Sequence, residues 1–352
     1  MKKILYLTNI ETPYRVRFFN ELAKQCELTV LYERCKSSNR NGQWSKSVEQ
    51  LYQTKYQTKY LNGIKLKGEN AISLGILKEI FCQYDAIIVG CFNSPSQLLA
   101  TLSMRVLRKP YILNLDGEIF LTGQGLKDKL KRFFLKGASA YLVAGEKSAE
   151  SVSEVVGNVP IIPYWFSSLS DSEIARNLQS GAERNDTILV IGQYFDYKGM
   201  DVALAAAWMD QSLHYKFVGM GSRTDLFLQE HDVPENVEVI PFLQKEDLEK
   251  EYQTCAMLVL PSRQECWGLV INEAASFGMP IVSTWGSGAA VEFLEDEYPQ
   301  YLAKPGDSQD LLNCIRKCMD TDDQKEYCTY LLEKSKKYSI ESSVNAHLRC
   351  IE

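Results

Sequence analysis

Residues 256–284 read AMLVLPSRQECWGLVINEAASFGMPIVST and contain two apolar runs with a helix-like segment between them. AMLVLPS, at 256–262, has the length and composition of a buried strand, and PIVST, at 280–284, is a second such run. Residues 268–277 lack proline and carry Leu269, Ile271, Ala274 and Ala275 among their apolar positions, which predicts a helix. A strand, a helix and a strand in this order predict a βαβ unit of a parallel sheet.

The same rhythm runs through all 352 residues. Strand-like runs alternate with helix-like segments: KILYLTN, LTVLYE, AIIVG, PYILNLD and AYLVAG in the first half, and ILVIGQ, YKFVG, VEVI, AMLVLPS and PIVST in the second. The pattern predicts an α/β protein with two doubly wound parallel sheets, and the length suits two domains. Pro160, Pro163 and the serine-rich stretch that follows, up to residue 170, indicate the join. We therefore expect domains at 1–163 and 164–335, followed by a C-terminal helix at 336–352.

Two glutamates, Glu265 and Glu273, stand eight positions apart around the start of the predicted helix. The first N–H groups of a helix lack partners within it and its dipole is positive there, so a phosphate can bind. If both carboxylates lay on the helix they would be roughly 12 Å apart, farther than the pair of a glycosidase, about 5–9.5 Å. The order would instead suit the sugar, diphosphate and ribose of a nucleotide sugar. Two glutamates at this spacing also occur by chance, one of them simply solvated.

The run ECWGLVINEAASFGMPIVST, beginning at Glu265, resembles the Glu, seven residues, Glu signature of the retaining GT-B glycosyltransferases of family 4. That family includes bacterial enzymes of capsule, exopolysaccharide and lipopolysaccharide assembly. The resemblance implies a GT-B fold, with two Rossmann-like domains and a C-terminal helix crossing back to the first. It also implies that Glu265 binds the donor sugar and Glu273 the ribose. The diphosphate would lie against the segment made of Cys266, Trp267, Gly268 and Leu269.

IGQYFDYKGMD, at 191–201, follows the apolar run ILVIG and offers a cation at the start of a helix-like segment. Such a cation stabilises the charge that grows on a diphosphate leaving group. The resembled family has Gly-Arg and then Lys-Gly here; this chain keeps Gly192 and Lys198 but has Gln193 in place of the arginine. Arg263 and Arg15 are both candidates for the missing charge. Lys198 could otherwise be a solvated turn residue.

Three glycine- or loop-containing segments extend the resemblance. FVGMGSR, at 217–223, places Gly219 in a turn near the nucleotide, although glycine is common in any strand-to-helix turn. PFLQKEDL, at 241–248, falls where family members contact the base, so Phe242 or Leu243 could border it, although either could equally be a core residue. TWGSGAAVEF, at 284–293, resembles the loop that closes over the donor.

NLDGEIF, at 114–120, places polar groups at the carboxyl end of a first-domain strand. Asn114, Asp116 and Glu118 are available there, and Asp116 is the candidate for contacting the donor sugar or the acceptor hydroxyl. Asp-Gly is also a common turn sequence.

No metal or other cofactor is expected to be essential, because a helix N-terminus with Lys198 can supply the electrostatic stabilisation that a divalent ion gives elsewhere. The aspartates of DTDD, at 320–323, are favoured as helix caps over metal ligands. The three histidines, His214, His231 and His347, stand in no catalytic motif. Ten cysteines without a C-x-x-C pair indicate reduced thiols.

The net charge of -6 hides a basic first part, +10 over residues 1–150, and an acidic remainder of -16. Basic and apolar residues alternate at 126–136, as on a helix lying at an anionic membrane surface, although an ordinary surface helix would look similar. The basic members are Lys127, Lys129, Lys131, Arg132 and Lys136. Nucleic acid is not an expected partner, because no binding motif accompanies the charge. No spanning run or signal peptide is evident, so we expect a cytoplasmic protein, peripheral at the inner face of the membrane.

Together these features predict a retaining glycosyltransferase that moves a hexose-type sugar from a nucleotide diphosphate sugar, UDP being the commonest choice, to a glycan or lipid-linked acceptor. A non-hydrolysing nucleotide-sugar epimerase of related fold and a noncatalytic nucleotide-sugar-binding adaptor are the alternatives. A nicotinamide-dependent oxidoreductase is disfavoured, because the segment TNIETPYR after the first strand contains no glycine.

Overall fold

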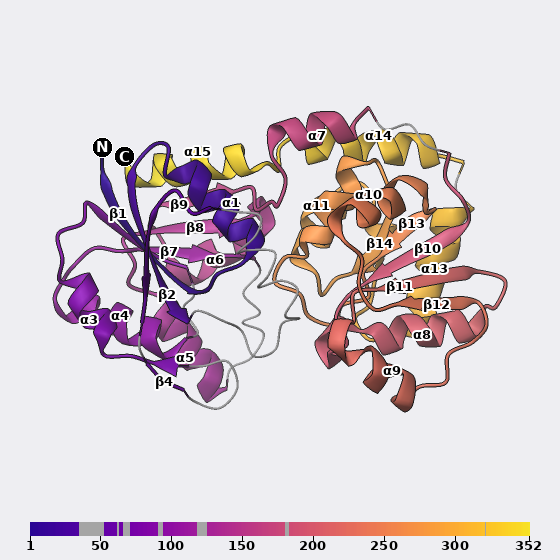
Figure 1. Ribbon diagram of the computed structural model, residues 1–352, viewed down its shortest axis with the longest axis horizontal. Helices are drawn as coiled ribbons and strands as arrows, with labels where there is room; N and C mark the ends of the chain where they lie inside the picture. Colours follow the sequence, from indigo (N-terminus) through magenta and orange to yellow (C-terminus); the bar gives the residue numbers. More distant parts are fainter. Residues whose placement is uncertain are drawn as a thin grey trace. The chain divides into compact units, whose positions relative to one another are not determined.

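The computed structural model describes residues 1–34, 53–61, 63–65, 71–90, 94–117, 125–179, 183–320 and 322–352, in two compact units (Figure 1). Unit 1 comprises Met1–Ser168 and Ile340–Glu352, and unit 2 comprises Leu169–Ser339. The units thus divide a few residues later than the 163/164 and 335/336 joins expected from the sequence. Residues 165–168 stay with unit 1 because Phe166 packs edge-on against Tyr14 at 5.7 Å and Arg17 donates to the Ser168 carbonyl at 2.5 Å.

Unit 1 is built on a seven-stranded sheet of order β3-β2-β1-β6-β7-β8-β9, all parallel, with a separate hairpin of β4 and β5. Its elements are β1 (Lys3–Ile10), α1 (Pro13–Leu22), β2 (Glu27–Arg34), β3 (Gln57–Tyr60), β4 (Ile64–Lys65), β5 (Ala71–Ile72), α3 (Gly75–Ile80), β6 (Ala86–Val89), α4 (Pro95–Val106), β7 (Ile112–Leu115), α5 (Leu126–Leu135), β8 (Ala140–Ala144), α6 (Glu146–Val156), β9 (Ile161–Tyr164) and α15 (Ile340–Ile351).

The central strands of unit 1 are buried on both faces, as a parallel sheet covered by helices requires. Ile4, Leu5, Tyr6 and Leu7 of β1 are each at most 1% exposed. Consecutive apolar residues therefore mark these strands, where an antiparallel sheet would show alternation.

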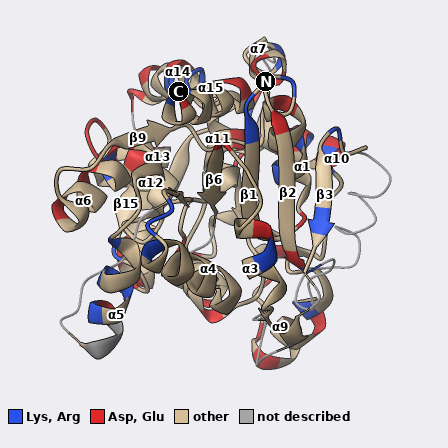
Figure 2. Ribbon diagram, turned by 90° about the vertical axis from the view of Figure 1, so that its left-hand side faces the viewer, with Lys and Arg blue, Asp and Glu red and all other residues tan. Residues whose placement is uncertain are grey.

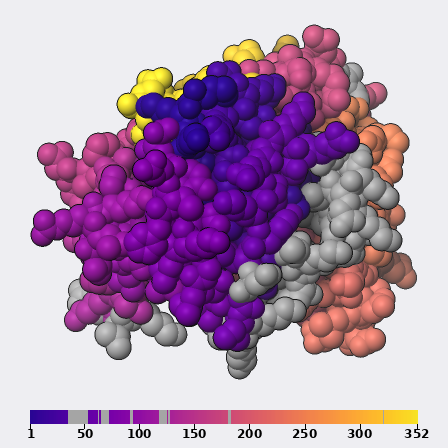
Figure 3. Space-filling view, turned by 60° about the vertical axis from the view of Figure 1, so that its left-hand side comes forward, coloured from indigo at the N-terminus to yellow at the C-terminus, as the bar shows by residue number. Residues whose placement is uncertain are grey.

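The C-terminal helix α15 belongs to unit 1 and packs on α1, β8 and β9. Val344 and His347 are buried in this packing, and Lys2 donates to the carbonyl of Ile351 at 2.6 Å. Figure 3 shows C-terminal residues (yellow) beside N-terminal residues (indigo) on the surface. The predicted return of the chain's last helix to the first domain is confirmed.

Unit 2 has a six-stranded parallel sheet of order β12-β11-β10-β13-β14-β15. Its elements are α7 (Asp171–Asn177), β10 (Thr187–Ile191), η1 (Asp196–Lys198), α8 (Met200–Met209), β11 (His214–Val218), η2 (Gly221–Arg223), α9 (Thr224–Glu230), β12 (Val237–Ile240), α10 (Lys245–Thr254), β13 (Met257–Val259), α11 (Leu269–Ser276), β14 (Ile281–Thr284), α12 (Gly288–Leu294), η3 (Pro299–Tyr301), β15 (Leu302–Ala303), α13 (Ser308–Met319) and α14 (Gln324–Ser335).

Each sheet has one point at which the strand order reverses. In unit 1 the chain builds outward from β1 to β3 and then continues on the other side with β6, and in unit 2 β10 and β13 stand in the same relation. Ligands of doubly wound sheets bind beyond the carboxyl ends of the strands at such a point. In unit 2 the expected ligand-binding segments are therefore those that follow β10 and β13.

Within the described ranges, no helix combines the length and the apolar composition needed to cross a membrane.

Candidate functional site

Lys198 and Glu265 meet at the reversal point of the unit 2 sheet. Lys198 ends the short helix η1 after β10, and Glu265 lies in the segment between β13 and α11. Lys198 Nζ donates to Glu265 Oε2, and the two side chains are 20% and 18% exposed. Two residues 67 positions apart in the sequence thus form an ion pair at the expected ligand-binding edge.

Glycines allow the chain segments at this edge to approach one another. Gly199 has φ +67°, and a Cβ there would overlap the carbonyl oxygen of Pro261. Gly192 and Gly219 follow β10 and β11, and a Cβ on Gly219 would lie 3.6 Å from the Gly192 carbonyl oxygen. Both glycines were predicted to stand at the nucleotide; the structure places them side by side at the strand ends.

Glu265 is fixed through its backbone. Its N–H donates to the Gly286 carbonyl at 2.8 Å, and its own carbonyl accepts from Gly288 N–H at 3.1 Å. The glycine loop predicted at 284–293 therefore holds the segment that carries Glu265. Because α11 begins only at Leu269, Glu265 lies outside the helix, and the 12 Å separation that assumed two helical glutamates does not apply.

The residues between Glu265 and α11 present backbone to the helix start. Trp267 is 2% exposed, and its indole N–H donates to Asn272 Oδ1 at 2.9 Å, so its ring is part of the core. Cys266 is exposed, while Gly268, at φ +103°, and Leu269 are partly buried at the N-terminus of α11. For Trp267, any ligand contact would come from the backbone.

Glu273 lies in the middle of α11 and is oriented by a buried tyrosine. The hydroxyl of Tyr252, on α10, donates to Glu273 Oε2 at 2.9 Å. Burial, with the Glu273 carboxylate as the next cause, raises the pKa of Tyr252 well above its ordinary value, so the tyrosine remains a donor. Tyr252 of α10 thus holds Glu273, the predicted ribose contact, in position.

The two arginines considered as a second phosphate cation each hold a carboxylate. Arg263 donates to both oxygens of Asp201, at 2.8 and 2.5 Å, and this pairing lowers the pKa of Asp201. Arg15, in unit 1, is paired with Asp116. Gln193 and Leu243 are partly buried in the loops after β10 and β12.

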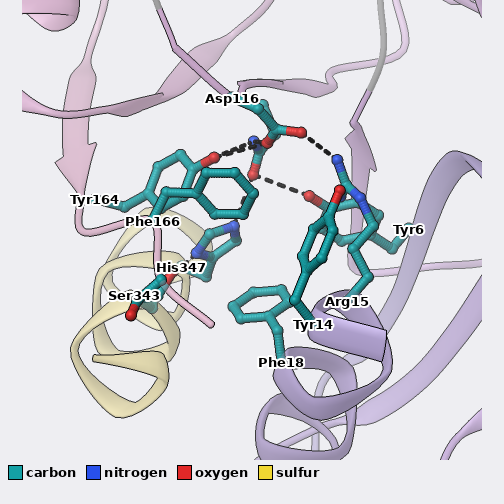
Figure 4. Close-up of a pocket in the computed structure, with 11 residues that line it drawn as sticks. Tyr6, Tyr14, Arg15, Phe18, Asp116, Tyr164, Phe166, Ser343 and His347 are labelled. Carbon is teal, nitrogen blue, oxygen red and sulfur yellow. Dashed lines mark hydrogen bonds and ion pairs between the residues drawn. The ribbon is translucent and has the colours of Figure 1, made fainter. Parts of the chain in front are cut away.

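Asp116 lies in a pocket of unit 1 that aromatic and polar side chains line together (Figure 4). It follows β7 and accepts hydrogen bonds from Tyr164, at 2.7 Å, and from the Asn114 amide, at 3.0 Å, besides its ion pair with Arg15. Burial is the largest single influence on the pKa of Arg15 and lowers it, but the Asp116 carboxylate and three neighbouring tyrosines together raise the pKa well above its ordinary value. Glu118, the third polar residue predicted here, lies outside the described residues.

His347, which no sequence motif marked, completes this pocket from α15. Nε2 lies 2.7 Å from Asn114 Oδ1 and Nδ1 lies 2.8 Å from the Ser343 carbonyl oxygen. Burial lowers the pKa of His347 to about 4, so the ring is neutral at pH 7. The signal available in the sequence was the predicted return of the last helix to the first domain, which carries one histidine with it.

In the described part of the chain, no group of three or more His, Cys, Asp or Glu residues is arranged to hold a metal ion. Asp323 is the N-cap residue of α14, at the position favoured for DTDD, although its side chain makes no capping hydrogen bond. The expectation that catalysis needs no metal stays a prediction.

Residues 171–337, nearly the whole of unit 2, match the model of the family described as "Glycosyl transferases group 1". An uncharacterized glycosyltransferase of Methanocaldococcus jannaschii is 24% identical over 73% of this chain and 72% of its own length. The lipopolysaccharide glucosyltransferase WaaG of Escherichia coli is 25% identical over 42% of this chain and 41% of its own. An uncharacterized glycosyltransferase of Haemophilus influenzae is 29% identical over 36% and 38% of the two chains. Except for the archaeal protein, the named relatives are thus matched over less than half their length.

Solved structures resemble the whole chain. Anabaena HepE in complex with UDP and glucose has a TM-score of 0.69 at 17% identity, covering 99% of this chain and 98% of that one. Sucrose-phosphate synthase from Thermosynechococcus elongatus has a TM-score of 0.69 at 16% identity, with the same coverage. These similarities establish the fold: the predicted GT-B architecture of two Rossmann-like α/β domains is confirmed.

Gly199→Ala should destabilise unit 2 by about 2–4 kcal/mol, since it adds a backbone overlap with Pro261 to the strain of a left-handed residue. Gly278→Ala is the matched control, because at φ +60° the three atoms nearest to its added Cβ belong to the Leu332 side chain and not to backbone. Urea unfolding would compare the two variants. Equal losses of stability would show that the approach to Pro261 is not a constraint.

His347→Gln should flatten the acid dependence of stability. The folded pKa, about 4, lies below the ordinary 6.5, so the unfolded chain binds the proton first as the pH falls. The stability that a neutral His347 preserves is present above pH 6.5 and lost towards pH 4, at most about 3 kcal/mol. Urea unfolding of the wild type at stepped pH should show this fall, His347→Gln should reduce it, and the exposed His214→Gln should not. An unchanged slope in His347→Gln would contradict the assignment.

Proposed function

We propose that this protein is a retaining glycosyltransferase of the family 4 type, transferring a hexose-type sugar from a nucleotide diphosphate sugar, UDP-linked by preference, to a glycan or lipid-linked acceptor. The ion pair of Lys198 and Glu265 at the reversal point of unit 2 is the observation that carries the proposal. The group 1 glycosyltransferase match over the same unit supports it. The printed complexes of HepE with UDP and glucose motivate the choice of nucleotide.

In the proposed donor site, a charged side chain and backbone N–H groups bind the diphosphate together. Lys198 has three N–H donors, so it can hold Glu265 and a phosphate oxygen at the same time. The N-terminus of α11, with Gly268 and Leu269, adds unpaired N–H groups and the positive end of a helix dipole. Glu265 would bind sugar hydroxyls, and Glu273, held by Tyr252, would bind the ribose.

Retention follows if the leaving group acts as the base. The bond between the anomeric carbon and the β-phosphate oxygen breaks, and the acceptor oxygen bonds to that carbon on the same face. The acceptor proton passes to the departing phosphate, giving a glycoside and a nucleoside diphosphate. Lys198 and the helix start stabilise the charge that develops on the phosphate, and no side-chain base or metal is needed.

The unit 1 pocket supplies the proposed acceptor-side contacts. Asp116 offers carboxylate oxygens, and the rings of Tyr14, Phe18 and Phe166 line the same pocket (Figure 4). Aromatic faces with a hydrogen-bonding carboxylate suit a sugar hydroxyl better than an anionic group, because the charge of Arg15 is already balanced by Asp116.

A basic and apolar surface on unit 1 supports a membrane-proximal acceptor. Lys and Arg residues lie along α5 (Figure 2), among them Lys129, Lys131 and Lys136, which are exposed; the side chain of Lys127 is outside those described. Leu130 and Phe133 are 55% and 47% exposed on the same helix. Arg105 of α4 stacks on Phe133 at 4.4 Å, next in sequence to Val106, which is 82% exposed. Cations around exposed apolar side chains suit an anionic lipid surface, at the inner face of the membrane.

Glu265→Gln should lower turnover at least a hundredfold while the nucleoside diphosphate still binds, because the amide keeps an acceptor for Lys198 but loses the charge. Glu273→Gln should mainly raise the KM for the donor, and it leaves Tyr252 an acceptor. Release of nucleoside diphosphate on addition of acceptor, over a panel of nucleotide sugars and sugar acceptors, is the measurement. Glu246→Gln, an exposed carboxylate of α10, is the control.

Three outcomes would contradict the proposed glycosyltransferase activity or the proposed residue roles. Normal turnover in both variants would remove Glu265 and Glu273 from their proposed roles. Interconversion of nucleotide sugars without acceptor would identify an epimerase. Binding of a nucleotide sugar without either reaction would identify an adaptor.

Lys129→Glu with Lys131→Glu should reduce binding to vesicles containing anionic phospholipid by tenfold or more, since each basic residue near such a surface contributes about 1 kcal/mol. Vesicle flotation at low and high salt measures the effect. Lys250→Glu with Lys317→Glu makes the same charge change on unit 2 and should bind like the wild type. Equal binding to neutral and anionic vesicles would contradict the electrostatic part of the proposal.

A further inference from the structure

Arg223 is a cation at the edge of the unit 2 sheet where a ligand is expected, and no sequence motif marks it. It ends η2, immediately after the glycine turn that follows β11, and its side chain is exposed. Because β10 and β11 are adjacent and parallel, the loops after them share one edge of the sheet. Arg223 therefore lies on the same side of unit 2 as Gly192 and Lys198.

The guanidinium of Arg223 is anchored to the loop that follows β10. Its Cζ lies 4.1 Å from the centre of the Phe195 ring, and its Nη1 donates to the Tyr194 carbonyl at 3.1 Å. The Phe195 ring stacks with that of Tyr197 at 5.4 Å, and Lys198 Nζ lies 5.8 Å from the Tyr197 ring. Two stacked rings thus lie between Arg223 and Lys198, and the contacts with Phe195 and Tyr194 hold an exposed arginine against the loop that carries Lys198.

Arg223 also differs from the neighbouring cations in its charge balance. Lys198 is paired with Glu265 and Arg263 with Asp201, and Lys216 of β11 is paired with Glu251. Among the described residues, Arg223 forms no ion pair. Its remaining N–H groups form a planar fork of the kind that binds phosphate oxygens in pairs.

We propose that Arg223 binds the diphosphate of the donor and supplies, with Lys198, the second positive charge that a diphosphate requires. The inference rests on the proposed function and deepens it. Gln193, in the same loop as Tyr194 and Phe195, is neutral, and Arg223 reaches that loop from the next strand. The second cation of the site therefore comes from the β11 loop in this chain.

The test is nucleotide binding, measured by calorimetry with UDP and, in parallel, GDP and ADP. Arg223→Gln should weaken binding of the preferred nucleoside diphosphate at least tenfold, the loss expected for a charge-assisted contact to phosphate. It should leave the much weaker binding of the corresponding nucleoside, titrated at high concentration, unchanged. Adding Gln193→Arg to Arg223→Gln should restore part of the affinity by returning a guanidinium to the loop.

Lys317→Gln is the control, since it removes one exposed positive charge from α13. Lys317 is next in sequence to Arg316, which pairs with Asp210 at the C-terminus of α8. That end of α8 lies at the edge of the sheet opposite to the proposed site. If Arg223→Gln binds the nucleoside diphosphate like the wild type, or weakens nucleoside and diphosphate equally, Arg223 does not bind the phosphates and the proposed function stands. If none of the three diphosphates binds the wild type, both proposals fall.

Discussion

The backbone contact between the segments that follow β10 and β13 is the constraint on which the site in unit 2 depends. Arg263 N–H and Gln264 N–H both donate to the Tyr197 carbonyl, at 2.9 and 3.1 Å. Gly199 allows the chain to turn against Pro261 where any side chain would overlap it. Because these segments are joined, the side chains of Lys198 and Glu265 lie close enough to form an ion pair. The site is thus set by backbone geometry before any side chain takes part.

Because the backbone already sets the site, partly exposed ion pairs are sufficient to orient its side chains. Lys198 and Glu265 are about one-fifth exposed, and pairs near the surface contribute little to stability, about 0–1 kcal/mol. Their value is orientation: each holds the other where a ligand would need it. Arg263 and Asp201 act similarly on the segment itself, since Arg263 also donates to the Asp196 carbonyl at 2.7 Å. A polar edge can therefore be ordered in the free protein and still exchange contacts with a ligand.

The sequence predicted the fold well because the signals are local. Apolar runs of strand length, such as the one at 187–191, and glycines after strands depend on neighbouring residues alone. Lys198 and Glu265 could be chosen for the same reason, since each stands beside a strand end or helix start. What local pattern could not give is the state of each side chain. The indole of Trp267 is buried, and Arg263 is held by Asp201.

The residues missed entirely are those whose partners come from another strand or from the far end of the chain. Arg223 can contact Phe195 and Tyr194 only because β10 and β11 are neighbours in the sheet. His347 is 233 positions from Asn114, and no sequence pattern near either residue predicts their contact. Pattern reasoning works along the chain, whereas these contacts are decided by which strands pair.

The unit 1 pocket shows what such a long-range contact imposes on the molecule. The whole of unit 2 lies between Ser168 and Ile340 in the sequence, so α15 is made after unit 2. Until it docks, Asn114 and Tyr164 lack the ring that packs beside them, and that side of β8 and β9 is uncovered. Closing so long a loop costs conformational entropy that grows only slowly with length, so burying the apolar face of α15 can offset it. The polar cluster around Asp116 is therefore complete only when α15 has docked, which ties the order of its proposed acceptor contacts to segments that lie on both sides of unit 2 in the sequence.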